Sequence, residues 1–189
     1  MSLTAYITHP SFLEHEMGEG HPECPARLNA INDYLLEQGY LDFMAPYTAP
    51  EVDPDTKMNS RTLSAARHAA GAAVLATDLV ISGEVMRAFC PVRPPGHHAE
   101  RDAAMGFCFF NNVTVGIRHA QRHHGISRVA LVDFDVHHGN GSEDILAGDD
   151  QVLMVSTFQH PLYPYLGDVP KGANMLNVPL PPRTRGDAL

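Results

Sequence analysis

Cysteine, long apolar runs and basic segments are all scarce in this chain of 189 residues. The three cysteines, Cys24, Cys90 and Cys108, have spacings that fit neither a zinc knuckle nor a paired disulfide framework, so we expect reduced, mostly buried thiols. No stretch approaches the roughly 18 apolar residues that a membrane helix needs. The start, MSLTAYITHPSF, lacks the basic, apolar and cleavage regions of a secretory signal. We therefore expect a soluble protein of the cytoplasm.

Positive charge is also in short supply. The chain has 13 lysines and arginines against 22 aspartates and glutamates, which gives a formal net charge of −9. This balance argues against general affinity for nucleic acid and is compatible with cationic substrates or partners. Hydrophobic residues make up 44% of the chain and charged residues 19%, which is typical of a globular protein. We expect one domain over residues 1–189 that binds neither nucleic acid nor membranes.

Apolar periodicity predicts alternating strands and helices. Strands are predicted at residues 4–12, 86–92, 128–136 and 151–158. Helices are predicted within residues 15–39 and at 59–81 and 111–125. This order implies right-handed crossovers and a largely parallel sheet. The runs VALV and VLMV are typical of parallel strands that helices cover on both faces. The stretches 46–54 and 161–186, rich in Pro and Gly, are interpreted as loops.

The strongest chemical motif is DFDVHHGNG, which directly follows the apolar run VALV. In open parallel sheets the functional crevice lies at the carboxyl ends of the strands. If extended geometry persists to residue 137, the side chains of Asp133, Asp135 and His137 project to one face. Carboxylates at the end of a buried strand need cations or hydrogen bonds, and this set resembles that of a catalytic zinc. The alternative is a solvated turn whose polar residues cap the next helix.

Two further segments follow strands and carry candidate site residues. In RPPGHH, two prolines and a glycine form a stiff turn that would hold His97 and His98 rigidly, as a general base requires. The alternative is an ordinary exposed loop. In GFCFFNN, the glycine permits close backbone approach and the aromatic rings would line a narrow tunnel or pack in the core. The pair at 123–124 ends a basic helical segment, where histidines complement the helix dipole, so no site is predicted there.

Taken together, these motifs resemble the superfamily of histone deacetylases and acetylpolyamine amidohydrolases. The closest subgroup is that of bacterial histone deacetylase-like amidohydrolases and class II deacetylases. The resemblance rests on HPECPARL, RPPGHHAE, GFCFFNN, DFDVHHGNG and VSTFQHPLYP, in family order, and covers the chain from Ala5 to about Pro181. It implies the arginase-deacetylase fold, with a mostly parallel sheet between helix layers. It also implies zinc-dependent hydrolysis of an acetylated amine, either acetyl-lysine in proteins or a small acetylated polyamine, to acetate and free amine.

The resemblance also implies two cation sites. Asp135 and His137 match two of the three zinc ligands of the family. A structural K⁺ site is implied as well, partly through backbone carbonyls. The residues that match it are Asp133, Asp135, His137, Ser156 and Thr157.

Catalytic roles are implied for two imidazoles and their partners. Asp133 matches the carboxylate that is hydrogen-bonded to the first histidine, His97. His98 matches the general base or acid, and Asn140 matches its partner. Arg27 matches an arginine near an internal cavity. The residues that match the walls of the acyl-lysine channel are Gly106, Phe107 and Tyr163.

The chain departs from the family pattern in two places. The third zinc ligand of the family belongs to a later Gly-Phe-Asp segment and the transition-state tyrosine comes later still, yet neither has a counterpart before Leu189. Near residues 49–51 the chain also reaches the long helix sooner than the family does. The resemblance therefore implies an incomplete, N-terminal portion. Two alternatives stay open: an inactive metal-binding or acyl-binding module, and an arginase-like ureohydrolase, which the glycine at position 139 disfavours because arginases resemble DxHxD.

Overall fold

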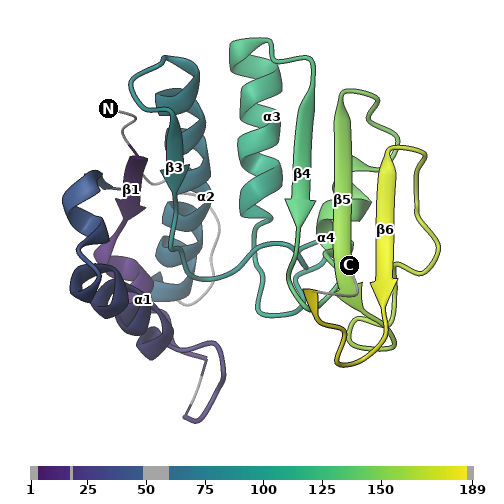
Figure 1. Ribbon diagram of the computed structural model, residues 1–189, viewed down its shortest axis with the longest axis horizontal. Helices are drawn as coiled ribbons and strands as arrows, with labels where there is room; N and C mark the ends of the chain where they lie inside the picture. Colours follow the sequence, from purple (N-terminus) through teal and green to yellow (C-terminus); the bar gives the residue numbers. More distant parts are fainter. Residues whose placement is uncertain (1–3, 18, 49–59, 187–189) are drawn as a thin grey trace.

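The computed structural model describes residues 4–17, 19–48 and 60–186 (Figure 1). The strands of the described part are β1 (Thr4–Thr8), β2 (Met44–Thr48), β3 (Arg87–Phe89), β4 (Val129–Asp133), β5 (Val152–Gln159) and β6 (Met175–Leu180). The α-helices are α1 (Pro25–Glu37), α2 (Ser60–Ile81), α3 (Asn112–His124) and α4 (Asn140–Leu146). Short 3₁₀ helices occupy Pro10–Leu13 and Tyr40–Phe43. The early passage to the long helix near residues 49–51 lies outside the described residues.

The strands form two parallel sheets, in the orders β2-β1-β3 and β4-β5-β6. The predicted α/β class with parallel strands is confirmed. Strands β2 and β6 correct the sequence analysis, because both overlap segments that were interpreted as loops. Each contains a proline, Pro46 or Pro179, and each is an outer strand of its sheet. Proline cannot donate a ladder hydrogen bond, so it is tolerated where a strand lacks a neighbour on one side, as at the outside of a sheet. The same proline makes the strand hard to recognise from sequence patterns.

The described chain has two halves, one built around the sheet β2-β1-β3 and one around the sheet β4-β5-β6. Helix α2 joins these halves. The described strands of one sheet make no ladder with those of the other, and α2 against α3 is the most extensive contact between the halves. Small residues allow this approach, since a Cβ added to Gly116 would lie 3.2 Å from the Cβ of Ala73. One core gathers residues of α2 with β1, and a second gathers α3 and α4 with β4, β5 and β6.

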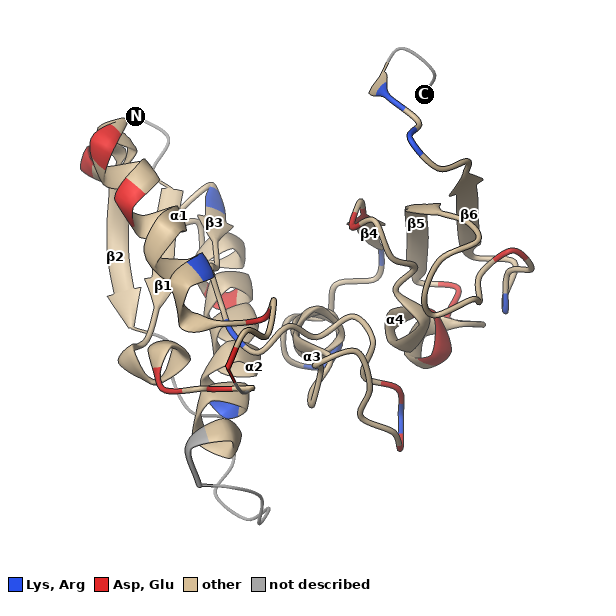
Figure 2. Ribbon diagram, turned by 90° about the horizontal axis from the view of Figure 1, so that it is seen from below, with Lys and Arg blue, Asp and Glu red and all other residues tan. Residues whose placement is uncertain are grey.

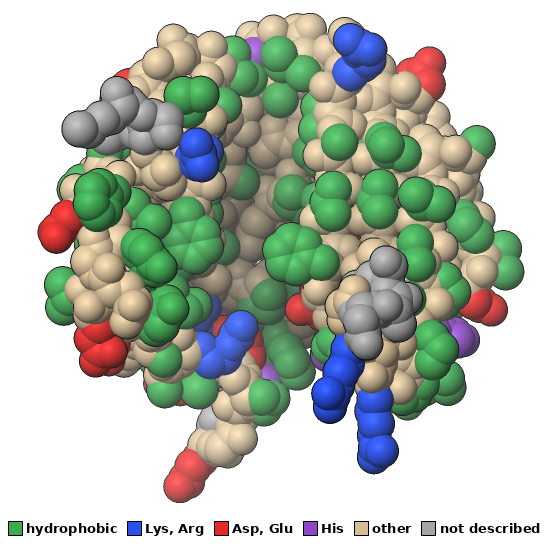
Figure 3. Space-filling view, viewed as in Figure 1, with side chains coloured by type: hydrophobic (Ala, Val, Ile, Leu, Met, Phe, Trp, Pro, Cys, Tyr) green, Lys and Arg blue, Asp and Glu red, His purple; other side chains and the backbone are tan. Residues whose placement is uncertain are grey.

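One face of the β4-β5-β6 sheet is exposed among the described residues. Val132 is 58% exposed, Leu153 50% and Leu176 54%, and apolar side chains gather over these strands in Figure 3. Among the described residues, the expected covering layer over VALV and VLMV is therefore present on one face only. Helices α3 and α4 cover the opposite face, which carries Val152 and Met154. A sequence of apolar residues reports that a strand favours burial, and it does not report whether a covering layer is present.

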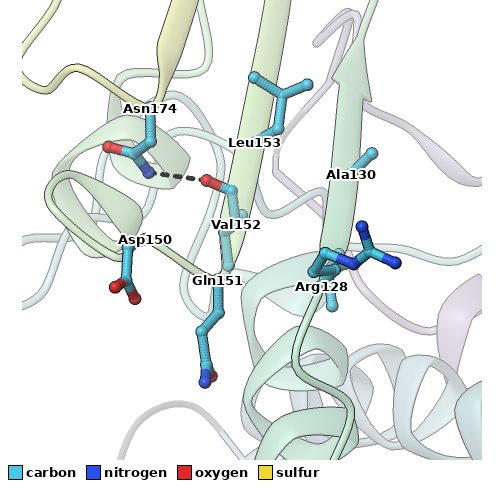
Figure 4. Close-up of a pocket in the computed structure, with 8 residues that line it drawn as sticks. Arg128, Ala130, Asp150, Gln151, Val152, Leu153 and Asn174 are labelled. Carbon is cyan, nitrogen blue, oxygen red and sulfur yellow. Dashed lines mark hydrogen bonds between the residues drawn. The ribbon is translucent and has the colours of Figure 1, made fainter.

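The amino ends of β4 and β5 border a cavity of about 640 Å³, which Figure 4 shows in close-up. The amide nitrogen of Asn174 lies 2.9 Å from the carbonyl oxygen of Leu146, 3.0 Å from that of Asp149 and 2.9 Å from that of Val152. This side chain therefore ties the end of α4 to the start of β5. The tie lies at the edge of the sheet opposite to the DFDVHHGNG motif.

Charged side chains are distributed over both halves. Figure 2 shows Lys and Arg interspersed with Asp and Glu along the ribbon. No described helix is long and apolar enough to cross a membrane.

Candidate active site

The motif after β4 folds into a turn that its own carboxylates hold. Extended geometry ends at Asp133 and does not persist to residue 137. The backbone N–H of Asp135 donates to Asp133 Oδ1 at 3.1 Å, and the N–H of His137 donates to Asp135 Oδ1 at 2.8 Å. Aspartate side chains commonly bond the backbone two residues further on, which bends the chain. The three side chains are therefore brought together by a turn and not by the alternation of a strand.

Two adjacent imidazoles from the RPPGHH turn meet this motif. His97 Nδ1 lies 2.9 Å from Asp133 Oδ2, and His98 Nδ1 lies 2.7 Å from Asn140 Oδ1. The Asn140 amide donates through Nδ2 to Glu100 Oε1 at 2.7 Å, which fixes its oxygen toward His98. Since this oxygen only accepts, Nδ1 of His98 carries the proton and Nε2 is left as an acceptor. The ring centroids of the two histidines are 4.0 Å apart.

The two imidazoles differ in charge preference. Burial lowers the pKa of His97, but the hydrogen bond and charge of Asp133 outweigh it, so the pKa lies above its ordinary value. Burial, followed by the positive charge of His97, lowers the pKa of His98 to about 4. Burial raises the pKa of Asp133, yet the bond from His97 reverses this and leaves the pKa below its ordinary value. Near neutral pH, His98 is therefore uncharged, whereas Asp133 favours the charged form of His97.

These groups face one cavity of about 570 Å³. Its lining residues are Pro22, Glu23, Arg27, Pro95, His97, His98, Gly106, Phe107, Asp135, His137 and Tyr163. The Tyr163 ring lies 5.1 Å from that of His98 and 6.0 Å from that of His137, as measured between centroids. Gly106 allows this packing, because a Cβ there would lie 2.2 Å from Cδ2 of His98. The predicted channel residues and the histidines thus line the same cavity.

The carboxylate and imidazole predicted to hold a metal are partly exposed at this cavity. The Asp135 side chain is 49% exposed and that of His137 38%, and His137 Nδ1 lies 3.1 Å from Asp135 Oδ1. Their donor types fit two positions of a catalytic zinc set. Within the described part of the chain, no third His, Cys, Asp or Glu joins them to form a three-ligand group.

The remaining predicted residues lie on neighbouring elements. Ser156 is opposite Asp133 in the ladder of β4 and β5, and its buried hydroxyl lies 3.1 Å from Nδ1 of His138. Thr157 follows it on β5. Arg27, which was expected near an internal cavity, is 57% exposed and lines the same cavity as the two histidines. Arg93, by contrast, is buried, with 3% of its surface exposed.

Sequence reasoning missed three polar residues that contact the site residues or the loops that carry them: Glu23, Arg93 and Glu100. The guanidinium of Arg93 forms a buried ion pair with Glu23 and donates to the carbonyl oxygens of Phe12 and His15. Behind Asn140, the missed partner is Glu100. Glu23, Arg93 and Glu100 all lie within the family motifs HPECPARL and RPPGHHAE, which was the only available signal. Their pairing across the chain has no local sequence pattern.

Parallel strands with helices, and imidazoles and carboxylates gathered where strands end, define an α/β protein with an enzyme-like site. The solved HD domain of HDA15 has the same fold, with a TM-score of 0.86 and 33% sequence identity. That similarity covers 94% of this chain and 62% of the solved chain. The predicted arginase-deacetylase fold class is thereby confirmed.

The sequence profile of the histone deacetylase domain matches residues 29–189, and the chain belongs to this family. A probable deacetylase of Archaeoglobus fulgidus is 33% identical over 217 residues, which span 96% of this chain and 60% of the relative. A histone deacetylase-like amidohydrolase of Pseudomonas aeruginosa is 44% identical over 142 residues, which span 71% of this chain and 37% of the relative. The chain therefore spans only part of the length of these relatives.

Proposed function

We propose that the complete protein hydrolyses an acetylated amine to acetate and free amine. The observation that carries this proposal is the pair of adjacent histidines with unlike partners, Asp133 for His97 and Asn140 for His98. An uncharged imidazole beside one whose charged form a carboxylate favours supplies a base and an electrostatic partner at the same cavity. Membership of the histone deacetylase domain family supports the reaction class.

Asp135 and His137 are the residues that would hold Zn²⁺ in this proposal. When bound there, the ion would supply Lewis-acid polarisation of the acetamide carbonyl and of the attacking water. His98 then takes the proton of the water at Nε2, because its Nδ1 is engaged with Asn140. His97, paired with Asp133, stabilises the negative charge that develops on the substrate. The residues proposed for a structural K⁺ are Asp133, Asp135, His137, Ser156 and Thr157.

Phe107 and Tyr163 are proposed as the walls of the acyl channel. Both line the cavity that contains His98, and Gly106 supplies the backbone wall between them. A narrow channel of aromatic rings suits the aliphatic chain of acetyl-lysine. A free acetylpolyamine would instead favour an acidic rim and restricted access. Turnover of acetyl-lysine peptides compared with acetylspermidine separates these substrates, and we expect the peptides to be preferred.

Metal dependence is tested in the complete protein with an acetyl-lysine reporter. We expect Asp135→Ala and His137→Ala each to abolish zinc binding and turnover, whereas Asp102→Ala, on an exposed loop, should change neither. Chelation should abolish turnover, and zinc should restore it. Full turnover after complete metal removal would overturn the proposal.

The rival function is a metal-binding or acyl-binding module without catalysis. It is favoured by one observation: within the described residues, no third His, Cys, Asp or Glu lies close enough to Asp135 and His137 to complete a three-ligand group. We propose this chain as a single, partial domain. Zinc stoichiometry measured beside turnover, for this chain and for the complete protein, discriminates the two functions. Weak zinc binding without turnover supports the module for this chain. Tight binding of one zinc with full activity supports a complete enzyme.

A further inference from the structure

A second group of metal-ligating side chains lies at the ends of α2 and α3. Asp78 belongs to the last turn of α2, and His119 and His124 belong to the last two turns of α3. Asp78 Oδ1 lies 2.6 Å from Nε2 of His119 and 2.6 Å from Nε2 of His124. One ligand atom from each residue lies within 4.8 Å of the others. The side chains are 44%, 18% and 26% exposed respectively, so a solvated ion can reach them.

Helix electrostatics favour a cation beside Asp78 at the carboxyl end of α2. The carboxyl end of a helix carries partial negative charge, so a carboxylate in its last turn is unfavourable. Asp78 occupies that position in α2, whose last turn has no basic residue. Helix α3 ends beside it, and the two imidazoles direct their Nε2 atoms at a single carboxylate oxygen. The helix-dipole role assigned to the 123–124 pair from sequence therefore omits the contact of His124 with another helix.

We propose that Asp78, His119 and His124 bind a divalent transition-metal ion of the zinc class, with water completing its coordination. Two imidazoles and one carboxylate are a set that Zn²⁺ and its neighbours favour, whereas Mg²⁺ and Ca²⁺ favour oxygen ligands. Zinc lies about 2.0–2.2 Å from such atoms, so tetrahedral ligands are roughly 3.3–3.5 Å apart. The two 2.6 Å contacts must therefore open by less than about 1 Å. Partly exposed side chains achieve this by small rotations.

This site is distant from the proposed catalytic cavity in both sequence and fold. Helices α2 and α3 end at the edge from which β3 and β4 start, whereas the cavity lies beyond the carboxyl ends of the strands (Figure 1). An ion here takes no part in the proposed hydrolysis. It would instead clamp α2 to α3, the helix pair that forms the main contact between the two halves. Because the folded chain alone brings the three ligands together, binding must stabilise the folded state.

The test measures Zn²⁺ and Co²⁺ binding to the full chain in a His137→Ala background, which removes one of the two proposed ligands at the catalytic cavity. We expect one bound ion by calorimetry, a visible Co²⁺ spectrum, and a thermal midpoint that rises with added Zn²⁺. Asp78→Asn, His119→Gln and His124→Gln should each weaken binding at least about tenfold, because each removes one of three ligands. His123→Gln is the matched control, since the same helix end carries this histidine outside the ligand group.

Two outcomes would overturn the site: no ion bound in the His137→Ala background, or equal weakening by His123→Gln. The second would indicate diffuse binding to surface histidines. If His137→Ala fails to fold, the Zn²⁺-dependent rise in thermal midpoint is compared between the unaltered chain and Asp78→Asn. An equal rise in both would also overturn the site. Deacetylation by the complete protein should be the same with Asp78→Asn, so failure here is distinguishable from failure of the proposed function.

Discussion

Asn140 Oδ1 accepts a hydrogen bond from His98 Nδ1 at 2.7 Å while its Nδ2 donates to Glu100 at 2.7 Å. The amide is therefore oriented by a carboxylate and presents a neutral acceptor to the imidazole. Next to it, Asp133 presents a charged acceptor to His97. Burial lowers the pKa of both histidines. The hydrogen bond and charge of Asp133 bring the pKa of His97 above its ordinary value, whereas the positive charge of His97 lowers the pKa of His98 further.

Asn140→Asp should convert the neutral partner of His98 into a charged one. A nearby carboxylate favours the imidazolium form, so the pKa of His98 should rise by about one unit. A base acts only when uncharged, so the acid limb of kcat/KM in the complete enzyme should move to higher pH. Asn140→Ala, which removes the partner without adding charge, should not move the limb upward. An unmoved limb in an Asn140→Asp protein that binds zinc normally would show that His98 is not the base.

Sequence patterns located the edge of the fold that carries the candidate site because the relevant signals are local. The DFDVHHGNG run follows an apolar strand, and strand ends in parallel sheets face the crevice. The turn geometry itself was not predictable. An extended strand, as expected, would place these residues on one face by alternation, and the observed turn places them together by bonding aspartates to backbone N–H groups. Both interpretations bring Asp133, Asp135 and His137 to one place, so the site was recognisable although its conformation was not.

Glu23→Gln should destabilise the fold strongly. Glu23 is 2% exposed and Arg93 3%, so the variant leaves a buried guanidinium without its counter-charge. Breaking a buried pair from one side costs about 3–5 kcal/mol. Arg27→Gln is the control, because Arg27 contacts the same carboxylate at 3.9 Å from a 57% exposed position. An exposed pair contributes about 0–1 kcal/mol. Urea unfolding of both variants measures the difference, and equal losses would contradict the assignment of the buried pair.

Gly141→Ala should also destabilise the fold, although alanine is the better helix former. A Cβ at residue 141 would lie 2.2 Å from the carbonyl oxygen of Ala99, and backbone cannot rotate away as a side chain can. Overpacking of this kind costs about 1–3 kcal/mol. Gly186→Ala meets no atom within 4 Å and should be neutral. Thermal unfolding compares the two, and a stable Gly141→Ala protein would show that α4 shifts freely against the segment after His98.

Long-range pairings are what the sequence could not supply. The bond between Arg93 and Glu23 joins residues 70 apart, and the contact of His119 with Asp78 joins residues 41 apart. Neither partner carries a local signal of the other. The proline-containing strands β2 and β6 were missed for a related reason, since only their place at the outside of a sheet makes Pro46 and Pro179 acceptable.

Glu143 should make stability fall as pH decreases below about 4.5, the ordinary value of its pKa. Its carboxylate is 1% exposed and accepts from His138 at 3.0 Å, from Asn177 at 2.7 Å and from the backbone of Lys171 at 3.1 Å. Burial raises its pKa, but these hydrogen bonds outweigh burial and hold the pKa below the ordinary value.

The unfolded chain therefore takes up the proton first, so the stabilisation is complete above the unfolded pKa and is lost as pH falls through the folded pKa. In Glu143→Gln this titration is absent. The free energy of unfolding of the wild type minus that of the variant should shrink between about pH 6 and pH 3, by about 1.4 kcal/mol for each unit by which folding lowers the pKa. Added salt should change this difference little, because the carboxylate is buried. A difference that stays constant over that range would mean that Glu143 titrates alike in the folded and unfolded chains.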